Sequence, residues 1–237
     1  MDVGPVELTG DLTTPAWPVG MVVFAHGSGN GRHSPHNRLV AQVLNHSRLA
    51  TVLVDLLTPA EEPDRAKVFD IGLLAGRLVG VTRWLQGQAE AHGLPVGFFG
   101  ASTGAAALWA AAGLGDQVGA VVSRGGRADL AGPRLAEVRA PTLLIVGGDD
   151  APVLEVNRIA RAQLGGHSAL EVIPGAGHLF EESGALGRVA ALAAGWFRRH
   201  LPQDPPARPH RMADRPAEPN PAAIARPTAD LARPARR

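Results

Sequence analysis

The chain has 237 residues and a formal net charge of +1, with 45% hydrophobic and 19% charged residues. This composition is typical of a globular protein large enough to bury a core, and its charge balance provides no field that would attract nucleic acid. The sequence contains no cysteine, which excludes disulfides, thiolate zinc sites and a cysteine nucleophile.

Targeting signals are not apparent in the sequence. Residues 1–12 lack the basic and apolar regions of a secretory signal, and no apolar run approaches the roughly 20 residues that a membrane helix needs. We therefore expect a cytoplasmic protein with no membrane partner.

Short apolar runs bounded by turn residues alternate along the chain with longer segments of helical periodicity. Strands are predicted at 6–8, 21–25, 51–54, 96–99, 118–122, 142–146 and 170–173. Helices are predicted at about 36–48, 70–91, 103–113, 153–164 and 184–200, the second of them capped by Asp70. Most strand runs are apolar without interruption, as in strands covered on both faces. The alternation predicts an α/β fold with a mostly parallel sheet and helices on both faces.

The composition changes at Pro202, where the remainder of the chain becomes rich in proline and arginine and poor in large apolar residues. Such a segment buries too little surface to offset its ordering entropy. We predict a folded domain over residues 1–201 and a disordered tail over residues 202–237. A weak anion-binding role of the arginines in the tail is the alternative.

The stretch GFFGASTGAAALWAAA, residues 97–112, leads from an apolar strand through a serine flanked by glycines into an alanine-rich helix. Gly100-Ala101-Ser102-Thr103-Gly104 matches the Gly-x-Ser-x-Gly nucleophile elbow, in which a strained turn exposes the serine hydroxyl above the sheet. The following helix directs its N-terminal N–H groups toward the same place. Glycines also occur at such junctions for ordinary packing, so the motif needs partners to be meaningful.

A serine hydroxyl needs a general base, and the base needs an acid that orients it. In parallel α/β sheets these residues follow in the order serine, acid, histidine. The predicted strand at 142–146 leads into Asp149 and Asp150, and the strand at 170–173 leads into His178. These positions lie beyond the carboxyl ends of strands, where open α/β sheets bind ligands. We predict Ser102, Asp150 and His178 as catalytic residues.

Simpler interpretations of the same residues stay open at this point. Asp149 and Asp150 can cap the helix at 153–164 or form a carboxylate pair for a metal. Because no third ligand lies nearby in the sequence, we predict no metal, and we expect Asp149 to support the turn. His178 can also be an ordinary loop histidine.

The loop FAHGSGNGRHSPHNR, after the predicted strand at 21–25, contains glycines like those of a phosphate cradle. It lacks the third glycine of a dinucleotide fingerprint and the Gly-Lys-Ser/Thr of a P-loop. A nucleotide-binding domain is therefore not predicted, and we expect no cofactor. The better match is a His-Gly oxyanion loop, in which a backbone N–H near Ser28 joins that of Thr103 and His26 braces the loop.

The segments HGSG, GASTG, GGDDAPV and GAGH, spread over about residues 3–200, resemble the dienelactone-hydrolase-like branch of the α/β-hydrolase superfamily. The resemblance implies an esterase-type acyl hydrolase in which Ser102 attacks, His178 acts as base and then as acid, and Asp150 fixes the imidazole. The Asp-x-x-Val spacing of that family favours Asp150 over Asp149. Dienelactone hydrolases proper have a cysteine where this chain has Ser102, and the N-terminal edge of the sheet is expected to be short.

These features together favour a serine hydrolase that cleaves small carboxylic esters, lactones or thioesters through an acyl-enzyme. An amidase or peptidase with the same triad, and a catalytically silent binding protein of the same fold, are the alternatives. The short connection between the predicted strands at 118–122 and 142–146 leaves no room for a lid domain. A homodimer is a further option, because a partner subunit can supply part of the wall of the cleft.

Arg124 follows the predicted strand at 118–122 and is a candidate for binding a substrate carboxylate. A structural salt bridge between Arg124 and Asp129 or another acid is the alternative interpretation. The sequence does not place Arg32 or Arg38 well enough to assign either of them a role.

Overall fold

The computed structural model describes residues 1–26, 31–102 and 105–201. The chain divides into a compact unit, Met1–Pro206, and a second unit, Ala207–Arg237, and all described residues belong to the first. The predicted tail over residues 202–237 and the predicted oxyanion residues Ser28 and Thr103 lie outside the described residues. These three assignments stay predictions.

A seven-stranded sheet in the order β3-β5-β4-β6-β7-β8-β9 forms the centre of the described unit. Every neighbouring pair is parallel except β3 and β5. The strands are β3 Gly10–Thr13, β4 Gly20–His26, β5 Leu49–Val54, β6 Val96–Ala101, β7 Val118–Arg124, β8 Thr142–Gly147 and β9 Ser168–Ile173. The predicted mostly parallel sheet is confirmed, and the strands from β4 to β9 overlap the predicted apolar runs.

The N-terminal edge differs from the sequence-based expectation. The strand predicted at 6–8 does not join the central sheet, because β2 (Val6–Glu7) pairs with β1 (Asp2–Val3) in a separate two-stranded sheet. The four-residue strand β3 forms the edge instead, antiparallel to β5. Its residues are mostly exposed, so it carries no apolar run from which a strand could be predicted.

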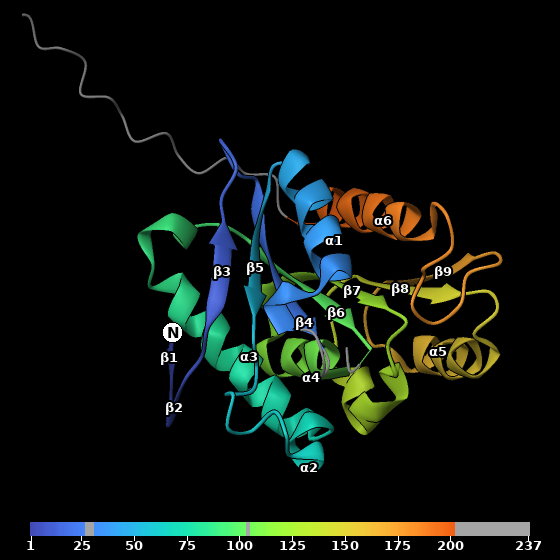
Figure 1. Ribbon diagram of the computed structural model, residues 1–237, viewed down its shortest axis with the longest axis horizontal. Helices are drawn as coiled ribbons and strands as arrows, with labels where there is room; N and C mark the ends of the chain where they lie inside the picture. The colour runs from blue at the N-terminus through green and yellow to red at the C-terminus, as the bar shows by residue number, and fades with distance from the viewer. Residues whose placement is uncertain (27–30, 103–104, 202–237) are drawn as a thin grey trace, which may run out of the picture. The chain divides into compact units, whose positions relative to one another are not determined.

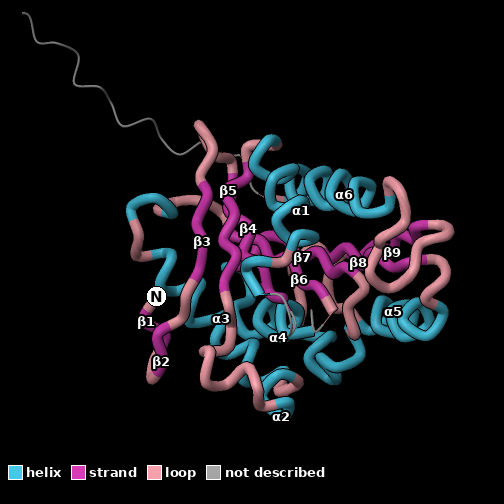
Figure 2. Tube along the Cα trace, viewed as in Figure 1, coloured by secondary structure: helices cyan, strands magenta, loops and turns pink. Residues whose placement is uncertain are grey.

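Helices cover both faces of the sheet (Figures 1 and 2). On one face lie α1 (Pro35–His46) and α6 (Ala185–His200), and on the other lie α3 (Ile71–Gln86), α4 (Ala105–Leu114) and α5 (Ala151–Gln163). The remaining elements are α2 Arg65–Val68, η1 Gly31–His33, η2 Ala89–Ala91, η3 Gly115–Gln117 and η4 Ala128–Glu137. Asp70 caps α3 as predicted, its carboxylate accepting a hydrogen bond from the Leu73 N–H at 2.9 Å.

The two helical layers bury two separate hydrophobic clusters. Phe24, Phe99 and Val122 point toward α1 and α6, whereas their neighbours Phe98 and Val121 point toward α3 and α4. Because successive strand residues face opposite sides, both sides of each central strand must be apolar. This explains the uninterrupted apolar runs of the sequence.

The connection between β7 and β8 contains only η4, which packs against α4 and α5. The expectation that no lid domain is inserted here is consistent with this short 3₁₀ segment. Within the described part of the chain, no helix combines the length and the hydropathy that crossing a membrane requires.

Candidate active site

Ser102 follows directly after the last residue of β6 and has a φ angle of +58°. Residues with a Cβ atom rarely adopt this left-handed conformation, because the side chain approaches the backbone too closely. The turn is held on both sides: the Ser102 N–H donates to the Arg124 carbonyl at 3.3 Å, and the Ser102 carbonyl accepts from the Arg127 N–H at 3.0 Å. Ser102 itself is exposed. A strained, exposed serine after a buried strand is the geometry that a nucleophile elbow requires.

His178 and Asp150 form a hydrogen-bonded pair, with 2.7 Å between His178 Nδ1 and Asp150 Oδ2. The Asp150 side chain is 12% exposed and the His178 side chain is 42% exposed. A carboxylate at Nδ1 holds the proton on that nitrogen and leaves Nε2 as the basic nitrogen of the ring. The pair therefore presents an oriented imidazole toward solvent.

The structure distinguishes the two adjacent aspartates. Asp150 occupies the N-cap position of α5, but its side chain makes no capping hydrogen bond and contacts His178 instead. Asp149 is exposed, and its N–H donates to the Ala176 carbonyl at 3.0 Å. Asp150 thus has the geometry of a triad acid, while the Asp149 backbone supports the turn.

Main-chain contacts join the loop after β8 to the loop that carries His178. The Gly148 N–H donates to the Ile173 carbonyl at 2.8 Å, beside the hydrogen bond from Asp149 to Ala176. A Cβ atom on Gly147 would lie 2.3 Å from the Ala176 carbonyl oxygen, closer than real contacts allow. Only glycine permits this close approach, which brings the two loops together.

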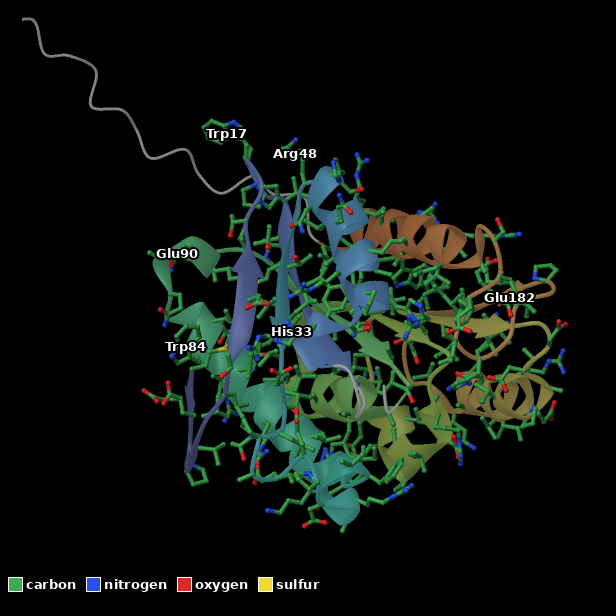
Figure 3. All side chains as sticks on the ribbon, viewed as in Figure 1. Trp17, His33, Arg48, Trp84, Glu90 and Glu182 are labelled. Atoms are coloured by element: carbon green, nitrogen blue, oxygen red, sulfur yellow. The ribbon has the colours of Figure 1, made fainter. Side chains whose placement is uncertain are left out.

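The segment between β9 and α6, residues 174–184, carries His178 and is called the histidine loop below. Glu182, which Figure 3 labels on this segment, also holds the loop in place. Its carboxylate accepts a hydrogen bond from the Gly177 N–H at 2.9 Å. Phe180 is 1% exposed and has a φ angle of +58°, so a buried ring anchors the chain just after His178. The loop is therefore held on both sides of the imidazole.

The histidine loop also packs against the turn that follows β7. A Cβ atom on Gly125, where φ is +53°, would lie 3.2 Å from the His178 carbonyl oxygen and 3.3 Å from the Phe180 ring. The neighbouring residues of this turn make the two hydrogen bonds to the Ser102 backbone. Ser102 and His178 therefore both lie against the turn that follows β7. Asp150 is connected to this turn through its hydrogen bond to the His178 ring. The structure thus joins Asp150 to His178 and places His178 and Ser102 against the same turn.

Arg124 is the last residue of β7 and is only 8% exposed. Among the residues that the structure describes, its Nε and Nη1 atoms are buried without a hydrogen-bond partner. Burial lowers the pKa of Arg124 to about 10, so the guanidinium still carries its charge at neutral pH. The predicted alternative partner, Asp129, binds both Nε and Nη2 of Arg127 instead, at 2.8 and 2.7 Å.

The sequence did not reveal an ion pair between Arg32 and Asp55. This pair lies on the side of β6 where β4 and β5 are, away from β7. Asp55, directly after β5, accepts a hydrogen bond from the Arg32 N–H at 2.7 Å and also pairs with the Arg32 guanidinium. This ion pair fixes η1, which precedes α1, to the carboxyl end of β5. Arg32 and Asp55 are too far apart in sequence, with a loop and a helix between them, for a motif to have shown the pairing.

Metal ligation finds no support in residues 1–26, 31–102 and 105–201. No group of three histidine, aspartate or glutamate side chains in these ranges is placed to hold a metal ion. The aspartate pair at 149 and 150 is divided between two roles, as described above.

Comparisons with known proteins identify relatives of this chain and of its fold. The structure matches a dienelactone hydrolase from Anabaena variabilis with 55% sequence identity and a TM-score of 0.82, covering 85% of this chain and 95% of that one. It matches the esterase Est1E from Butyrivibrio proteoclasticus with a TM-score of 0.69 and 16% identity, covering 84% and 96% of the two chains. The second match supports the fold alone.

Two curated proteins, from two strains of Mycobacterium tuberculosis, are 61% identical to this chain over 199 residues. Both are provisionally named phosphoribosyl transferases. The match covers 84% of this chain but 45% of each relative, so the chain spans just under half of their length. No protein-family model matches the chain. Its identity to the cyanobacterial enzyme over nearly the whole of both chains shows that this chain belongs to the dienelactone hydrolase family of α/β-hydrolases.

Proposed function

We propose that this protein is a serine hydrolase that cleaves small carboxylic esters, lactones or thioesters through an acyl-enzyme. The observation that carries the proposal is the 2.7 Å contact between His178 and Asp150 at the same turn that holds the strained Ser102. The 55% identity to the dienelactone hydrolase supports hydrolysis of ester bonds in general, and the more distant matches support the fold.

In the proposed reaction, His178 Nε2 removes the proton from Ser102 Oγ as the oxygen attacks the carbonyl carbon of the substrate. The tetrahedral intermediate collapses when His178 returns the proton to the leaving alcohol, and Ser102 stays acylated. Water then attacks the acyl-enzyme by the same two proton transfers, releasing the acid and free Ser102. Asp150 stays ionised throughout and stabilises the imidazolium.

Electrostatic stabilisation of the intermediate is assigned to the start of α4. The helix begins three residues after Ser102, and its free N–H groups and dipole favour negative charge at its N-terminus. The backbone N–H groups near Ser28 and of Thr103 remain the proposed oxyanion donors. Each such donor contributes on the order of 10²–10³ in rate in well-studied hydrolases.

The provisional name of the mycobacterial relatives is not carried over to this chain. More than half of each of those proteins lies outside the matched region, so an activity of the whole protein need not belong to that region. The catalytic geometry described above lies within the part that this chain contains.

A fluorophosphonate probe tests the proposal directly, because it labels a serine only when a neighbouring base activates it. We expect the wild-type protein to be labelled at Ser102, and Ser102→Ala to be unlabelled and to lose about six decades in kcat on 4-nitrophenyl acetate. Ser168→Ala, at the start of β9, is the matched control and should be labelled like the wild type. Labelling at another serine, or activity retained in Ser102→Ala, would refute the proposed nucleophile.

A further inference from the structure

Asn157 is a buried amide on α5 that the proposed mechanism does not use. It is 1% exposed, and its Nδ2 atom donates to the carbonyls of Gly126 and Val153, each at 2.8 Å. Both partners are carbonyl oxygens, which only accept, so the nitrogen must face them. The Asn157 Oδ1 atom is buried without a hydrogen-bond partner among the described residues. An apolar side chain would avoid the cost of burying that oxygen, which indicates that the donor side of the amide has a role.

One of the two bonds reaches the turn that holds the nucleophile. The bond to Val153 stays within α5, whereas the bond to Gly126 spans 31 residues to the turn after β7. Gly126 lies between Arg124, whose carbonyl accepts the Ser102 N–H, and Arg127, whose N–H donates to the Ser102 carbonyl. A Cβ atom on Gly126 would lie 3.6 Å from the Ser102 carbonyl oxygen. A shift of Gly126 would therefore move the backbone contacts on both sides of Ser102.

The same helix carries the proposed triad acid. Asp150 is the N-cap residue of α5, and Asn157 follows seven residues later, after about two helical turns. At one point α5 contacts His178 through Asp150, at 2.7 Å, and at the other it contacts the Ser102 turn through Asn157. Because two turns of hydrogen-bonded helix form a rigid spacer, α5 connects the acid–histidine pair to the serine turn.

We infer that Asn157 is a positioning residue, which sets the Ser102 turn at its distance from the Asp150–His178 pair by holding the Gly126 carbonyl. The inference rests on the proposed function, because this distance affects a rate only if the three residues react together. A misplacement of about 1 Å caused by a remote substitution can cost about 100-fold in rate. Asn157 contacts the turn and not the substrate, so its loss should lower kcat far more than it changes KM.

Kinetics on 4-nitrophenyl acetate provide the first test. Asn157→Leu, similar in size but without donors, should lower kcat by about 10- to 100-fold and change KM by no more than about twofold. Asn157→Ser keeps a hydroxyl that can donate to the Val153 carbonyl, four residues back, but it is too short to reach Gly126, so it should show the same fall. The matched control is Thr82→Val on α3, which removes a buried hydrogen bond to the Leu78 carbonyl and should keep the wild-type kcat. Wild-type kcat in Asn157→Leu or Asn157→Ser would overturn the inference.

A double-mutant cycle separates positioning from support of the fold. In the Asp150→Asn background, Asn157→Leu should lower kcat by less than about threefold, because the alignment of a histidine that has lost its productive tautomer matters little. A substitution that acts only through the fold would lower kcat by the same factor in both backgrounds. An equal loss in the two backgrounds would therefore assign Asn157 to the fold and refute the positioning role.

Amide hydrogen exchange, followed by NMR, tests the inference without turnover. In Asn157→Leu the N–H groups of Ser102 and Arg127 should exchange at least about tenfold faster than in the wild type, because the turn opens locally. The Val121 N–H, which donates to the Pro141 carbonyl on the same strand β7, should keep its exchange rate. If the wild type turns over no ester, the proposed function fails, and this exchange still decides whether Asn157 holds the turn. Unchanged exchange at Ser102 and Arg127 would contradict the inference even if the hydrolase survives.

Discussion

Arg77 and Arg124 are buried to almost the same extent, 7% and 8% exposed, yet their surroundings differ completely. Arg77, on α3, binds both carboxylate oxygens of Glu61 at 2.7 Å and donates to the Leu56 carbonyl at 2.7 Å. Glu61 in turn accepts hydrogen bonds from the N–H and the hydroxyl of Thr58. Arg124 has no comparable partner among the described residues.

The comparison separates a buried charge that the fold neutralises from one for which the described residues provide no carboxylate. The Arg77–Glu61 pair ties the segment after β5 to α3, and the chain supplies both partners. The hydrogen bonds from Arg77 and Thr58 hold the pKa of Glu61 well below its usual range, so the acid stays ionised. Arg124 contacts the strained Ser102 through its backbone carbonyl, and among the described residues its Nε and Nη1 atoms have no hydrogen-bond partner. The predictions below examine this distinction, starting with the largest effect.

Asp150 and Asp149 are a second pair of like residues: the Asp150 side chain hydrogen-bonds to His178, whereas Asp149 makes its contact through the backbone N–H. We expect Asp150→Asn to lower kcat by about 10⁴, because the amide no longer holds the productive tautomer of His178. Asp149→Asn should change kcat far less, since Asp149 supports the turn through its backbone N–H. Steady-state kinetics on 4-nitrophenyl acetate compares the two. The reverse ranking would show that the acid is misassigned.

Removing each of the two buried arginines should change the free energy of unfolding differently. Arg77→Met leaves the partly buried Glu61 without its cation, and we expect the free energy of unfolding to fall by about 1.5–3 kcal/mol. Arg124→Met removes a buried cation whose Nε and Nη1 atoms have no hydrogen-bond partner among the described residues, so the free energy of unfolding should stay level or rise. Urea unfolding followed by circular dichroism measures both. A large loss in Arg124→Met would mean that the fold satisfies this guanidinium after all.

The Arg77–Glu61 pair should also make the free energy of unfolding depend on pH. The folded-state pKa of Glu61 is below the ordinary value of 4.5, so the pair stabilises the fold fully above about pH 4.5 and progressively less as pH falls toward the folded-state pKa. The difference in unfolding free energy between wild type and Arg77→Met should therefore be larger at pH 7 than at pH 3.5. A difference that does not change between these pH values would assign the effect of Arg77 to packing alone.

The smallest expected effect concerns the acyl chain length of neutral esters. A buried methylene contributes about 0.8 kcal/mol, but only where a wall covers it. The described connections at 56–69 and 125–141 are short and rich in charged residues and glycine, and η4 packs against α4 and α5. We expect kcat/KM to be highest for acetyl to hexanoyl 4-nitrophenyl esters and to fall beyond octanoyl. A steady rise through dodecanoyl, or a jump in rate above the micelle concentration, would contradict this.

Much of the fold was predictable because the sheet is covered on both faces. Burial on both sides makes β4 to β9 continuously apolar, and that pattern is visible in the sequence without knowledge of neighbours. The exposed edge strand β3 carries no such pattern, and the paired β1 and β2 are too short to show one. The helices were predictable from their periodicity and, for α3, from its Asp70 cap.

The candidate site divides in the same way between sequence and structure. By itself, the sequence determined the order of serine, acid and histidine and their places after β6, β8 and β9, because chain order and strand ends are local properties. Only the tertiary structure decided that Asp150 faces His178, that Gly147 lets the two loops meet, and that Arg124 is buried with two nitrogens unpaired among the described residues. Pairing and burial depend on which residues lie side by side in space, and here those residues come from strands far apart in the chain.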